Sequence, residues 1–414
     1  MKKVVVIGSG IIGMFSAYYL NKKGYEVVIL DKKDRPSGAS TGNAGMIVPS
    51  HFIPLAAPGV IAKGLKWMFK SKSPFSVHPS PGMDLFHWLW LFYKASKRDL
   101  SAPMQSLRNL GVESRKLYTQ FHAEEQPPVG FKEKGLVMYT RSKKIFEEEI
   151  EIAHKADALG IKTEILNREQ AQQLDPSLTL DVVGGVYYPG DAFLSPNSLV
   201  ESLQNTLQSR GVRFLWNENI KEISIQRNKI SHIVTKDKSI EADEFVLAAG
   251  NESAALGKMM GIHLPLQPGK GYSMTLANPI EMPQVCSILT EARVAVTPMK
   301  EGLRFAGTLE LGANSLGINK NKVKGIIESI PSFFPKFREE NFSTEPVWSG
   351  LRPCSPDGLP YIGRSKKLTN LTIGTGHAMM GVSLAPVTGE IISTIIDGKK
   401  HSISLELIHP DRYQ

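Results

Sequence analysis

The stretch that decides the fold lies at the start of the chain, where residues 4–13 read VVVIGSGIIG and residues 26–31 read EVVILD. Residues 4–7 form a continuous β-branched run, as expected for a buried parallel strand. Three glycines follow in the spacing Gly-x-Gly-x-x-Gly, and then come a helix-like stretch and a second apolar strand. This order of strand, glycine turn, helix and strand predicts a parallel α/β unit that binds a dinucleotide.

Each glycine of the motif has a separate physical task. Gly8 permits the tight turn off the strand, and Gly10 lets a pyrophosphate approach the backbone. Gly13 lets the following helix pack closely on the sheet. The N-terminus of that helix, at Ile11 and Ile12, offers free N–H groups and the positive end of a dipole to a phosphate.

An acid at the end of the second strand indicates the kind of nucleotide. Asp31 lies 23 residues after Gly8, where its carboxylate can accept hydrogen bonds from ribose hydroxyls. Because such an acid favours a free 2′-hydroxyl, the motif predicts NAD or FAD rather than NADP. The motif alone does not choose between NAD and FAD.

The composition is typical of a globular protein with more than one domain, because 414 residues of 42% hydrophobic content can bury sizeable cores. Cys286 and Cys354 lie far apart and in no metal-like spacing, so neither a disulfide framework nor a metal site is expected. The chain begins Met-Lys-Lys directly before the first strand, which predicts a cytoplasmic location without a signal peptide.

The net charge of +9 comes from dispersed basic residues, so no nucleic-acid partner is expected. A solvated positive surface is the simplest reading of this charge, and attraction to the anionic inner face of a cell membrane is the next.

One aromatic segment has two possible interpretations. Residues 83–93 read MDLFHWLWLFY, with a second aromatic group at 67–69 and several lysines nearby. Such a segment can lie in a bilayer interface as a peripheral membrane contact. We favour a core helix of the substrate domain, because the segment is apolar all round and is not a clean amphipathic helix.

The order of the predicted elements indicates a nucleotide domain that is interrupted twice. We predict an α/β protein, α+β overall, whose Rossmann-like domain comprises residues 1–50, 190–260 and 345–414. An inserted, β-rich substrate domain is predicted for residues 51–189 and 261–344. Such a layout is unlike that of a nicotinamide dehydrogenase, in which one compact domain follows another.

No second dinucleotide fingerprint accompanies the first, because the glycines of residues 312–317 have the wrong spacing. A flavoprotein that is reduced by NAD(P)H often carries such a second motif. Its absence suggests that electrons enter from a small substrate, and this favours FAD as the cofactor.

Several segments together resemble one family. They are residues 8–31, GASTGNAG at 38–45, AAG at 248–250, WSGLRPCSPDGLP at 348–360 and GTGHAMMG at 374–381. The chain resembles the D-amino-acid oxidase superfamily of FAD-dependent oxidoreductases over nearly its whole length. The sequences NAG at 43–45 and PLAAPG at 54–59 look most like the bacterial D-amino acid dehydrogenase small-subunit group.

The resemblance implies an extended FAD whose flavin ring lies at the domain interface. Ser40 matches the family's phosphate-side hydroxyl, and a helix from about Val382 would point its positive end at the flavin. The residues that the resemblance places along the cofactor are Gly8, Gly10, Ile11, Ile12, Gly13, Asp31, Lys32, Ser40, Asn43, Ala44, Gly45, Met46, Ala249, Gly250, Gly376, His377, Met380 and Gly381. Cys354 does not match the offset of relatives with covalent flavin, so non-covalent FAD is predicted.

The resemblance also names residues for the substrate. Arg352 matches the family arginine that clamps the substrate carboxylate, a task suited to the planar guanidinium. Tyr272 could form a second bond to the carboxylate, and His51 and His377 are further candidates for the pocket. Residues 49–52, PSHF, differ from related dehydrogenases and suggest a specialised pocket, for example for D-proline or D-hydroxyproline.

The implied reaction is oxidative deamination of a D-amino or cyclic imino acid by hydride transfer from Cα to flavin N5. Electrons would then pass to a quinone or another respiratory acceptor. One alternative is an oxidase of glycine or sarcosine that produces hydrogen peroxide. Another is a subunit that binds FAD without turnover, although such a subunit would not need the carboxylate clamp at Arg352.

Overall fold

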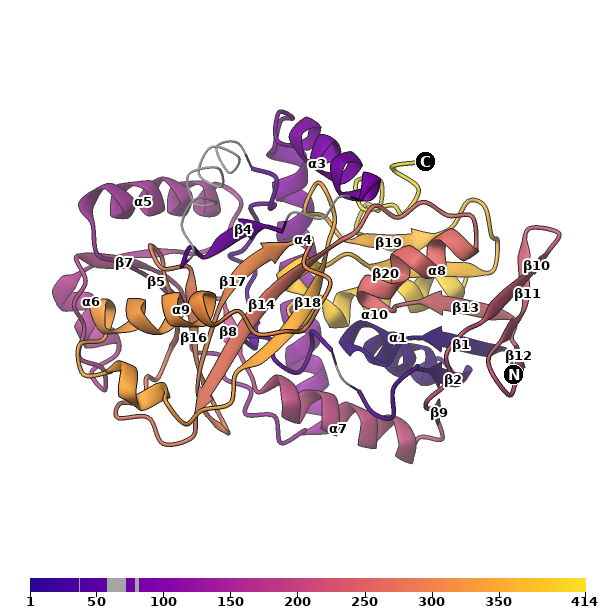
Figure 1. Ribbon diagram of the computed structural model, residues 1–414, viewed down its shortest axis with the longest axis horizontal. Helices are drawn as coiled ribbons and strands as arrows, with labels where there is room; N and C mark the ends of the chain where they lie inside the picture. Colours follow the sequence, from indigo (N-terminus) through magenta and orange to yellow (C-terminus); the bar gives the residue numbers. More distant parts are fainter. Residues whose placement is uncertain (37, 58–71, 79–81) are drawn as a thin grey trace.

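The computed structural model describes residues 1–36, 38–57, 72–78 and 82–414, and two large sheets lie side by side in it (Figure 1). The first sheet has six strands in the order β19-β20-β13-β1-β2-β9. All its neighbours pair in parallel except β19, which is antiparallel to β20. The strands are β1 (Lys3–Ile7), β2 (Glu26–Leu30), β9 (Arg213–Leu215), β13 (Glu244–Leu247), β19 (Tyr361–Arg364) and β20 (Leu371–Thr375). Distant parts of the chain therefore build one Rossmann-like sheet, as the sequence predicts.

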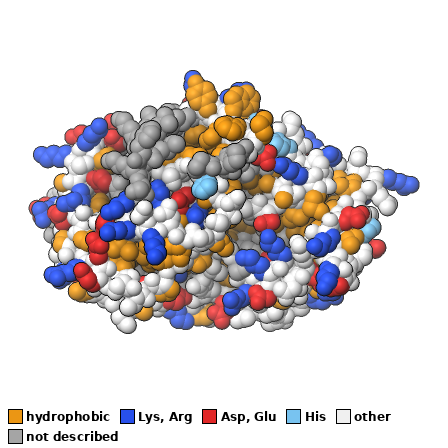
Figure 2. Space-filling model, in the orientation of Figure 1, with side chains coloured by type: hydrophobic (Ala, Val, Ile, Leu, Met, Phe, Trp, Pro, Cys, Tyr) orange, Lys and Arg blue, Asp and Glu red, His pale blue; other side chains and the backbone are white. Residues whose placement is uncertain are grey.

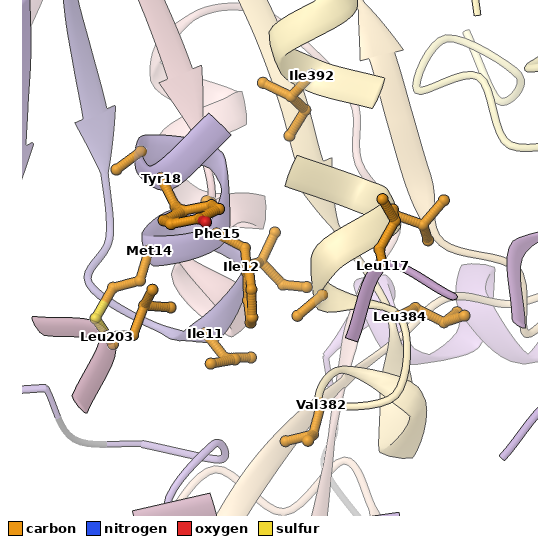
Figure 3. Close-up of a cluster of buried hydrophobic side chains, with 14 of the residues drawn as sticks. Ile11, Ile12, Met14, Phe15, Tyr18, Leu117, Leu203, Val382, Leu384 and Ile392 are labelled. Atoms are coloured by element: carbon orange, nitrogen blue, oxygen red, sulfur yellow. The ribbon is translucent and has the colours of Figure 1, made fainter. Parts of the chain in front are cut away.

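Both faces of this sheet are covered, which explains the continuous apolar run of β1. Val4 and Val6 pack into a core with four helices, whereas Val5 and Ile7 face a second core on the opposite side. The helices of the first core are α1 (Ile11–Lys22), α4 (Ser101–Glu125), α7 (Pro196–Ser209) and α10 (Ala385–Ile396). Figure 3 shows side chains of α1 beside Ile392 of α10 and Leu117 of α4. The opposite side carries α8 (Ser253–Met259) and a small sheet of β10 (Glu222–Gln226), β11 (Lys229–Val234) and β12 (Ser239–Glu241).

The second sheet has nine strands, in the order β18-β14-β17-β16-β15-β5-β7-β6 with β4 beside β17. The strands are β4 (Phe75–Val77), β5 (Leu136–Thr140), β6 (Glu164–Asn167), β7 (Gly184–Tyr188), β14 (Gln267–Leu276), β15 (Cys286–Leu289), β16 (Val294–Met299), β17 (Gly302–Leu311) and β18 (Trp348–Cys354). Helix α9 (Lys320–Phe333) covers one face with a phenylalanine-rich core. The other face packs against Met46, Val48 and Phe52, which follow the glycine-rich segment of residues 38–45.

The remaining elements complete the β-rich part and its connections. They are β3 (Met46–Ile47), which pairs with β8 (Ala192–Phe193), the helices α3 (Met83–Ala95), α5 (Lys143–Ala158) and α6 (Arg168–Leu174), and three short 3₁₀ turns, η1 (Gly250–Glu252), η2 (Glu339–Phe342) and η3 (Ala378–Met380). Strand β18 lies inside the range 345–414 that we predicted for the nucleotide domain, but it pairs with β14 of the second sheet. The exact domain boundaries therefore remain a prediction.

Residues 83–95 form the helix α3, but this helix is not a core helix. Trp88 is 1% exposed, whereas Phe86 on the outer face is 63% exposed. The apolar character all round the helix thus serves one buried face and one outward face. The aromatic residues 67–69 lie outside the described residues. Within the described part of the chain, none of the helices combines the length and the hydropathy that crossing a bilayer requires.

Candidate functional site

The glycine turn after β1 has two glycines that the protein itself requires and one that it does not. A Cβ on Gly8 would lie 2.5 Å from the Ala248 carbonyl oxygen, and Gly8 has φ +107°. A Cβ on Gly13 would lie 2.0 Å from the Gly8 carbonyl oxygen, so α1 could not pack on β1. A Cβ on Gly10 would meet nothing closer than the Ser40 hydroxyl, at 3.8 Å. The space over Gly10 is therefore open, which fits a cradle for a pyrophosphate.

The N-terminus of α1 faces this space. Its N-cap is Gly10, so no side chain caps the helix. The Ile11 N–H donates to the Ser40 hydroxyl at 3.2 Å, which brings Ser40 to the same point. Backbone N–H groups, a helix dipole and a hydroxyl thus meet beside an open glycine, as a phosphate site requires. Ile12, one residue further on, packs against Gly374 at the end of β20.

The acid at the end of β2 is held in a defined orientation. One Asp31 carboxylate oxygen accepts from the Ser9 N–H at 2.7 Å and from the Ser9 hydroxyl at 2.6 Å. The other oxygen accepts from the Lys33 N–H at 3.0 Å. Lys32, which we predicted near the ribose, forms an exposed ion pair with Glu252 at 3.0 Å. Asp31 therefore lies where the motif predicts it, and its carboxylate keeps lone pairs for ribose hydroxyls.

The two segments predicted to contact the flavin lie side by side. The Asn43 amide donates to the Met379 carbonyl at 3.2 Å, and the Val48 N–H donates to the Ser383 hydroxyl at 2.9 Å. Asn43 also accepts from the Gly45 N–H at 2.8 Å, which fixes the turn between them. The structure thus joins residues 43–48 to the loop that precedes α10, although more than 300 residues separate them.

The other predicted cofactor residues surround the same region. Ala44 and Met380 pack against the buried cluster that contains Met46. The Gly250 carbonyl accepts from the Thr375 hydroxyl at 3.1 Å. Ala249 lies beside the Gly8 turn, Gly376 has φ +77°, and a Cβ on Gly381 would touch only the Cβ of His377 at 3.9 Å.

His377 stabilises this loop. Its Nε2 lies 2.9 Å from the Thr388 hydroxyl, and that hydroxyl donates to the Leu384 carbonyl. Nε2 must therefore carry the proton that the hydroxyl accepts. Burial lowers the pKa of His377 to about 3, so the ring is neutral. This bond ties the loop to α10, which gives His377 a positioning role; its contact with the substrate stays a prediction.

Arg352 on β18 has more N–H donors than its one bond to a described residue uses. Its Nη1 donates to the Thr308 carbonyl at 2.7 Å, and it forms no ion pair with any residue that the structure describes. Thr308 has φ +69°, and the register of β14 against β17 shifts nearby, so a strained backbone aims this carbonyl at the guanidinium. Burial lowers the pKa of Arg352 below its ordinary value, but an arginine stays charged. The site therefore holds a cation whose remaining N–H groups can bind a carboxylate.

Tyr272 does not share this site, and the prediction that it binds the substrate carboxylate is wrong. The guanidinium of Arg352 lies over Gly271, where a Cβ would come within 2.1 Å of it. Successive residues of a strand face opposite sides, so Tyr272 points away from Arg352. Its hydroxyl donates to the Glu310 carboxylate and accepts from the Asn319 N–H at 3.2 Å, inside the core beneath α9.

His51 belongs to a chain of three polar groups that the sequence does not reveal. Its Nδ1 lies 3.1 Å from the Ser50 hydroxyl, which donates to the Asp191 carboxylate at 2.5 Å. Burial raises the pKa of Asp191 to about 7, and burial beside Arg293 lowers the pKa of His51 to about 4. Because the Ser50 hydroxyl donates its own proton to Asp191, His51 Nδ1 donates to Ser50, and the lone pair of the neutral ring is on Nε2. A proton can therefore pass between the His51 ring and the Asp191 carboxyl through the Ser50 hydroxyl.

Sequence reasoning also missed Arg304 and Trp348. The Arg304 guanidinium donates to the carbonyls of Thr41 at 3.0 Å and Asn43 at 2.8 Å, so it shapes the segment that we predict to lie beside the flavin. The Trp348 ring lies against Gly42, where a Cβ would come within 2.0 Å of it. Strand β17 is buried along its whole length, so a charged residue within it is a signal that could have pointed to Arg304.

Comparisons with known proteins agree with this geometry. Residues 3–395 match the family described as "DAO: FAD dependent oxidoreductase". The D-amino acid dehydrogenase of Helicobacter pylori is 30% identical over 396 residues, which cover 95% of this chain and 94% of that protein. The D-amino acid dehydrogenase of Vibrio vulnificus is 30% identical over 415 residues and 96% of each chain.

Solved structures share the fold. Glycine oxidase from Geobacillus kaustophilus superposes with a TM-score of 0.80 at 22% identity, and the match covers 100% of both chains. L-proline dehydrogenase from P. horikoshii gives a TM-score of 0.76 at 18% identity, covering 100% of this chain and 97% of that one. The glycine turn with its open cradle, the acid at the end of β2 and the match over residues 3–395 lead to one conclusion: the chain belongs to the DAO family of FAD-dependent oxidoreductases.

Proposed function

We propose that this protein oxidises a D-amino acid or a cyclic D-imino acid, such as D-proline or D-hydroxyproline, and passes the electrons to a quinone or another respiratory acceptor at the inner face of the cell membrane. The observation that carries the proposal is Arg352, whose guanidinium has a single carbonyl partner and no carboxylate partner among the described residues. The relatives at 30% identity are D-amino acid dehydrogenases, which supports the choice of substrate class.

Arg352 binds the substrate carboxylate through two parallel N–H bonds and thereby fixes the orientation of Cα. FAD, when bound, supplies the acceptor for the hydride that leaves Cα. The substrate amine must be neutral before this step, and His51 Nε2 is our candidate to take its proton. The Ser50 hydroxyl and the Asp191 carboxyl can then pass that proton on from His51.

We propose that FAD is held without a covalent bond. Cys354 is the cysteine nearest to Arg352 in sequence, and burial raises the pKa of its thiol to about 12. A thiol with that pKa is not ionised near neutral pH, and the thiolate is the nucleophile that a flavin–cysteine bond requires. The cofactor residues are those around Gly10, Ser40 and Asp31, together with the joined segments 43–48 and 376–381.

The experiment that tests the function is an anaerobic bleaching screen across D- and L-amino acids, both proline stereoisomers and the hydroxyprolines. We expect bleaching of the flavin absorbance by a D-substrate and a loss of about 10² to 10³ in kcat/KM for Arg352→Gln, because two charge-assisted bonds are removed. Arg352→Lys keeps the charge but loses the fork, so it is expected to recover part of the activity. Flavin content is the control, since neither variant touches the cradle at Gly10.

The same screen separates the alternatives. Hydrogen peroxide formed in stoichiometric yield under air, without dye reduction, would indicate an oxidase of glycine or sarcosine instead. A stable flavoprotein that no amino acid bleaches would indicate a subunit without turnover. An Arg352→Gln variant as active as the wild type would exclude our substrate site.

A further inference from the structure

The outer face of α3 is an apolar stripe that no described residue covers. Met83, Phe86, Trp90 and Tyr93 recur at helical spacing and are 83%, 63%, 50% and 48% exposed. Figure 2 shows hydrophobic side chains projecting from the upper edge of the molecule, where Figure 1 places α3. Apolar side chains gathered in one patch on a protein surface mark an interaction site more often than scattered ones do.

The inner face of the same helix is firmly attached, so the outer stripe is not the result of a loosely packed helix. The Trp88 indole N–H donates to the Cys354 carbonyl at 2.9 Å. Trp88 also packs with Leu309 and Leu311 of β17, and Ala378 of the flavin loop packs against the same cluster. The fold therefore uses the inner residues of α3, and among the described residues only neighbours on or just after the same helix contact the outer aromatic rings.

Positive charges border the stripe. The Lys94 ammonium lies 3.5 Å from the centre of the Trp90 ring, and the Lys97 ammonium lies 4.4 Å from that of Tyr93. The acid at the start of the helix, Asp84, is paired with Lys258 at 2.7 Å. Aromatic rings with lysines beside them match the boundary of a bilayer, where rings enter the acyl region and ammonium groups meet anionic headgroups.

We propose that the outer face of α3 binds the surface of an anionic phospholipid bilayer. A second copy of the chain is a poorer occupant, because a symmetric contact would place Lys94 and Lys97 against their own copies. The lipid contact adds a membrane partner to the proposed function. Its consequence for electron transfer rests on that proposed function. Trp88 joins α3 to the carbonyl of Cys354, two residues after Arg352, so a docked α3 holds the substrate strand close to the membrane that contains the quinone.

The test is sedimentation of the FAD-loaded protein with vesicles of phosphatidylglycerol and phosphatidylcholine, compared with pure phosphatidylcholine. We expect binding to the anionic vesicles and a decrease of at least tenfold in the partition coefficient for the double variant Phe86→Ala/Trp90→Ala. Lys94→Gln/Lys97→Gln is expected to lose about fivefold per lysine on anionic vesicles only. The matched control Ile225→Ala/Ile280→Ala removes two exposed apolar side chains from other surfaces and should bind like the wild type.

Three results would overturn the proposal: no binding of the wild type to anionic vesicles, equal binding of the Phe86/Trp90 variant, or a dimer in sedimentation velocity that this variant converts to monomer. Vesicle binding requires no turnover, so it stands even if no amino acid bleaches the flavin. Conversely, reduction of a soluble dye by substrate tests the proposed function without lipid. If both hold, reduction of a quinone embedded in vesicles should fall in the Phe86/Trp90 variant while dye reduction is unchanged.

Discussion

Replacement of Gly10 by alanine is predicted to weaken the binding of FAD at least tenfold while leaving the apoprotein folded. Gly10 has φ −66° and ψ 170°, which alanine adopts without strain, and the nearest atom to the new methyl group is the Ser40 hydroxyl at 3.8 Å. Loss of chain entropy in the unfolded state and the weaker N-cap oppose each other, so the free energy of unfolding should change by less than about 1 kcal/mol. The methyl group instead fills the space that the pyrophosphate needs.

The size of the expected change in FAD affinity follows from the hydrogen bonds that are lost. A pyrophosphate pushed away from the N-terminus of α1 loses one or more hydrogen bonds from N–H groups to a charged oxygen, each worth about 1.5 to 3 kcal/mol. The Kd for FAD should therefore rise at least tenfold, measured by flavin fluorescence in a titration of the apoprotein. Urea unfolding of the apoprotein provides the stability measurement.

Gly13→Ala is the matched control, because it places the same methyl group in the same motif against protein rather than against ligand space. Its Cβ would lie 2.0 Å from the Gly8 carbonyl oxygen, so the apoprotein should lose about 1 to 3 kcal/mol or more. Our reasoning would be refuted if Gly10→Ala bound FAD within twofold of the wild type, or if it destabilised the apoprotein as much as Gly13→Ala does.

Three further predictions concern buried groups. The pKa of Asp191 is raised to about 7 in the folded protein from an ordinary 3.8, so its contribution to stability falls by up to about 4 kcal/mol as pH rises from about 4 to 7. Asp191→Asn should therefore be more stable than the wild type at pH 8 but not at pH 4. A difference in urea unfolding that does not depend on pH would contradict this. The pKa of His377 is lowered from 6.5 to about 3, so its contribution to stability is complete above pH 6.5 and falls by about 3 kcal/mol by pH 4. His377→Gln keeps a donor for Thr388 and should make the loss of stability at acid pH less steep. If the stability of the variant fell as steeply as that of the wild type, His377 would not be the origin of the loss. Acid precipitation of the wild type and of Cys354→Ser should leave the yellow colour in the supernatant for both, whereas a yellow pellet from the wild type alone would establish a covalent bond to Cys354.

Local sequence patterns were sufficient to predict the structure wherever the contacts that define a segment lie within that segment or on the adjacent strand. The strand–turn–helix unit at residues 3–22 needs Gly8 and Gly13 for contacts within a few residues or to the adjacent strand, so their spacing alone predicts them. The interrupted Rossmann-like sheet could be predicted as well, because its inner strands β1, β2, β13 and β20 are mostly apolar and buried. The exact domain boundaries were not reachable in this way, since β18 lies within the third predicted segment but pairs with β14.

The sequence by itself determined that this chain binds an adenine dinucleotide and, through its motifs, which family of flavoproteins it resembles. Only the tertiary structure decided which faces and which partners the candidate side chains have. It places Arg352 and Tyr272 on opposite faces of neighbouring strands, joins His51 through Ser50 to Asp191, and leaves one side of α3 uncovered. The physical reason is that strand pairing, which depends on register between segments far apart in sequence, sets the face that a residue presents, whereas a glycine turn depends on its immediate neighbours.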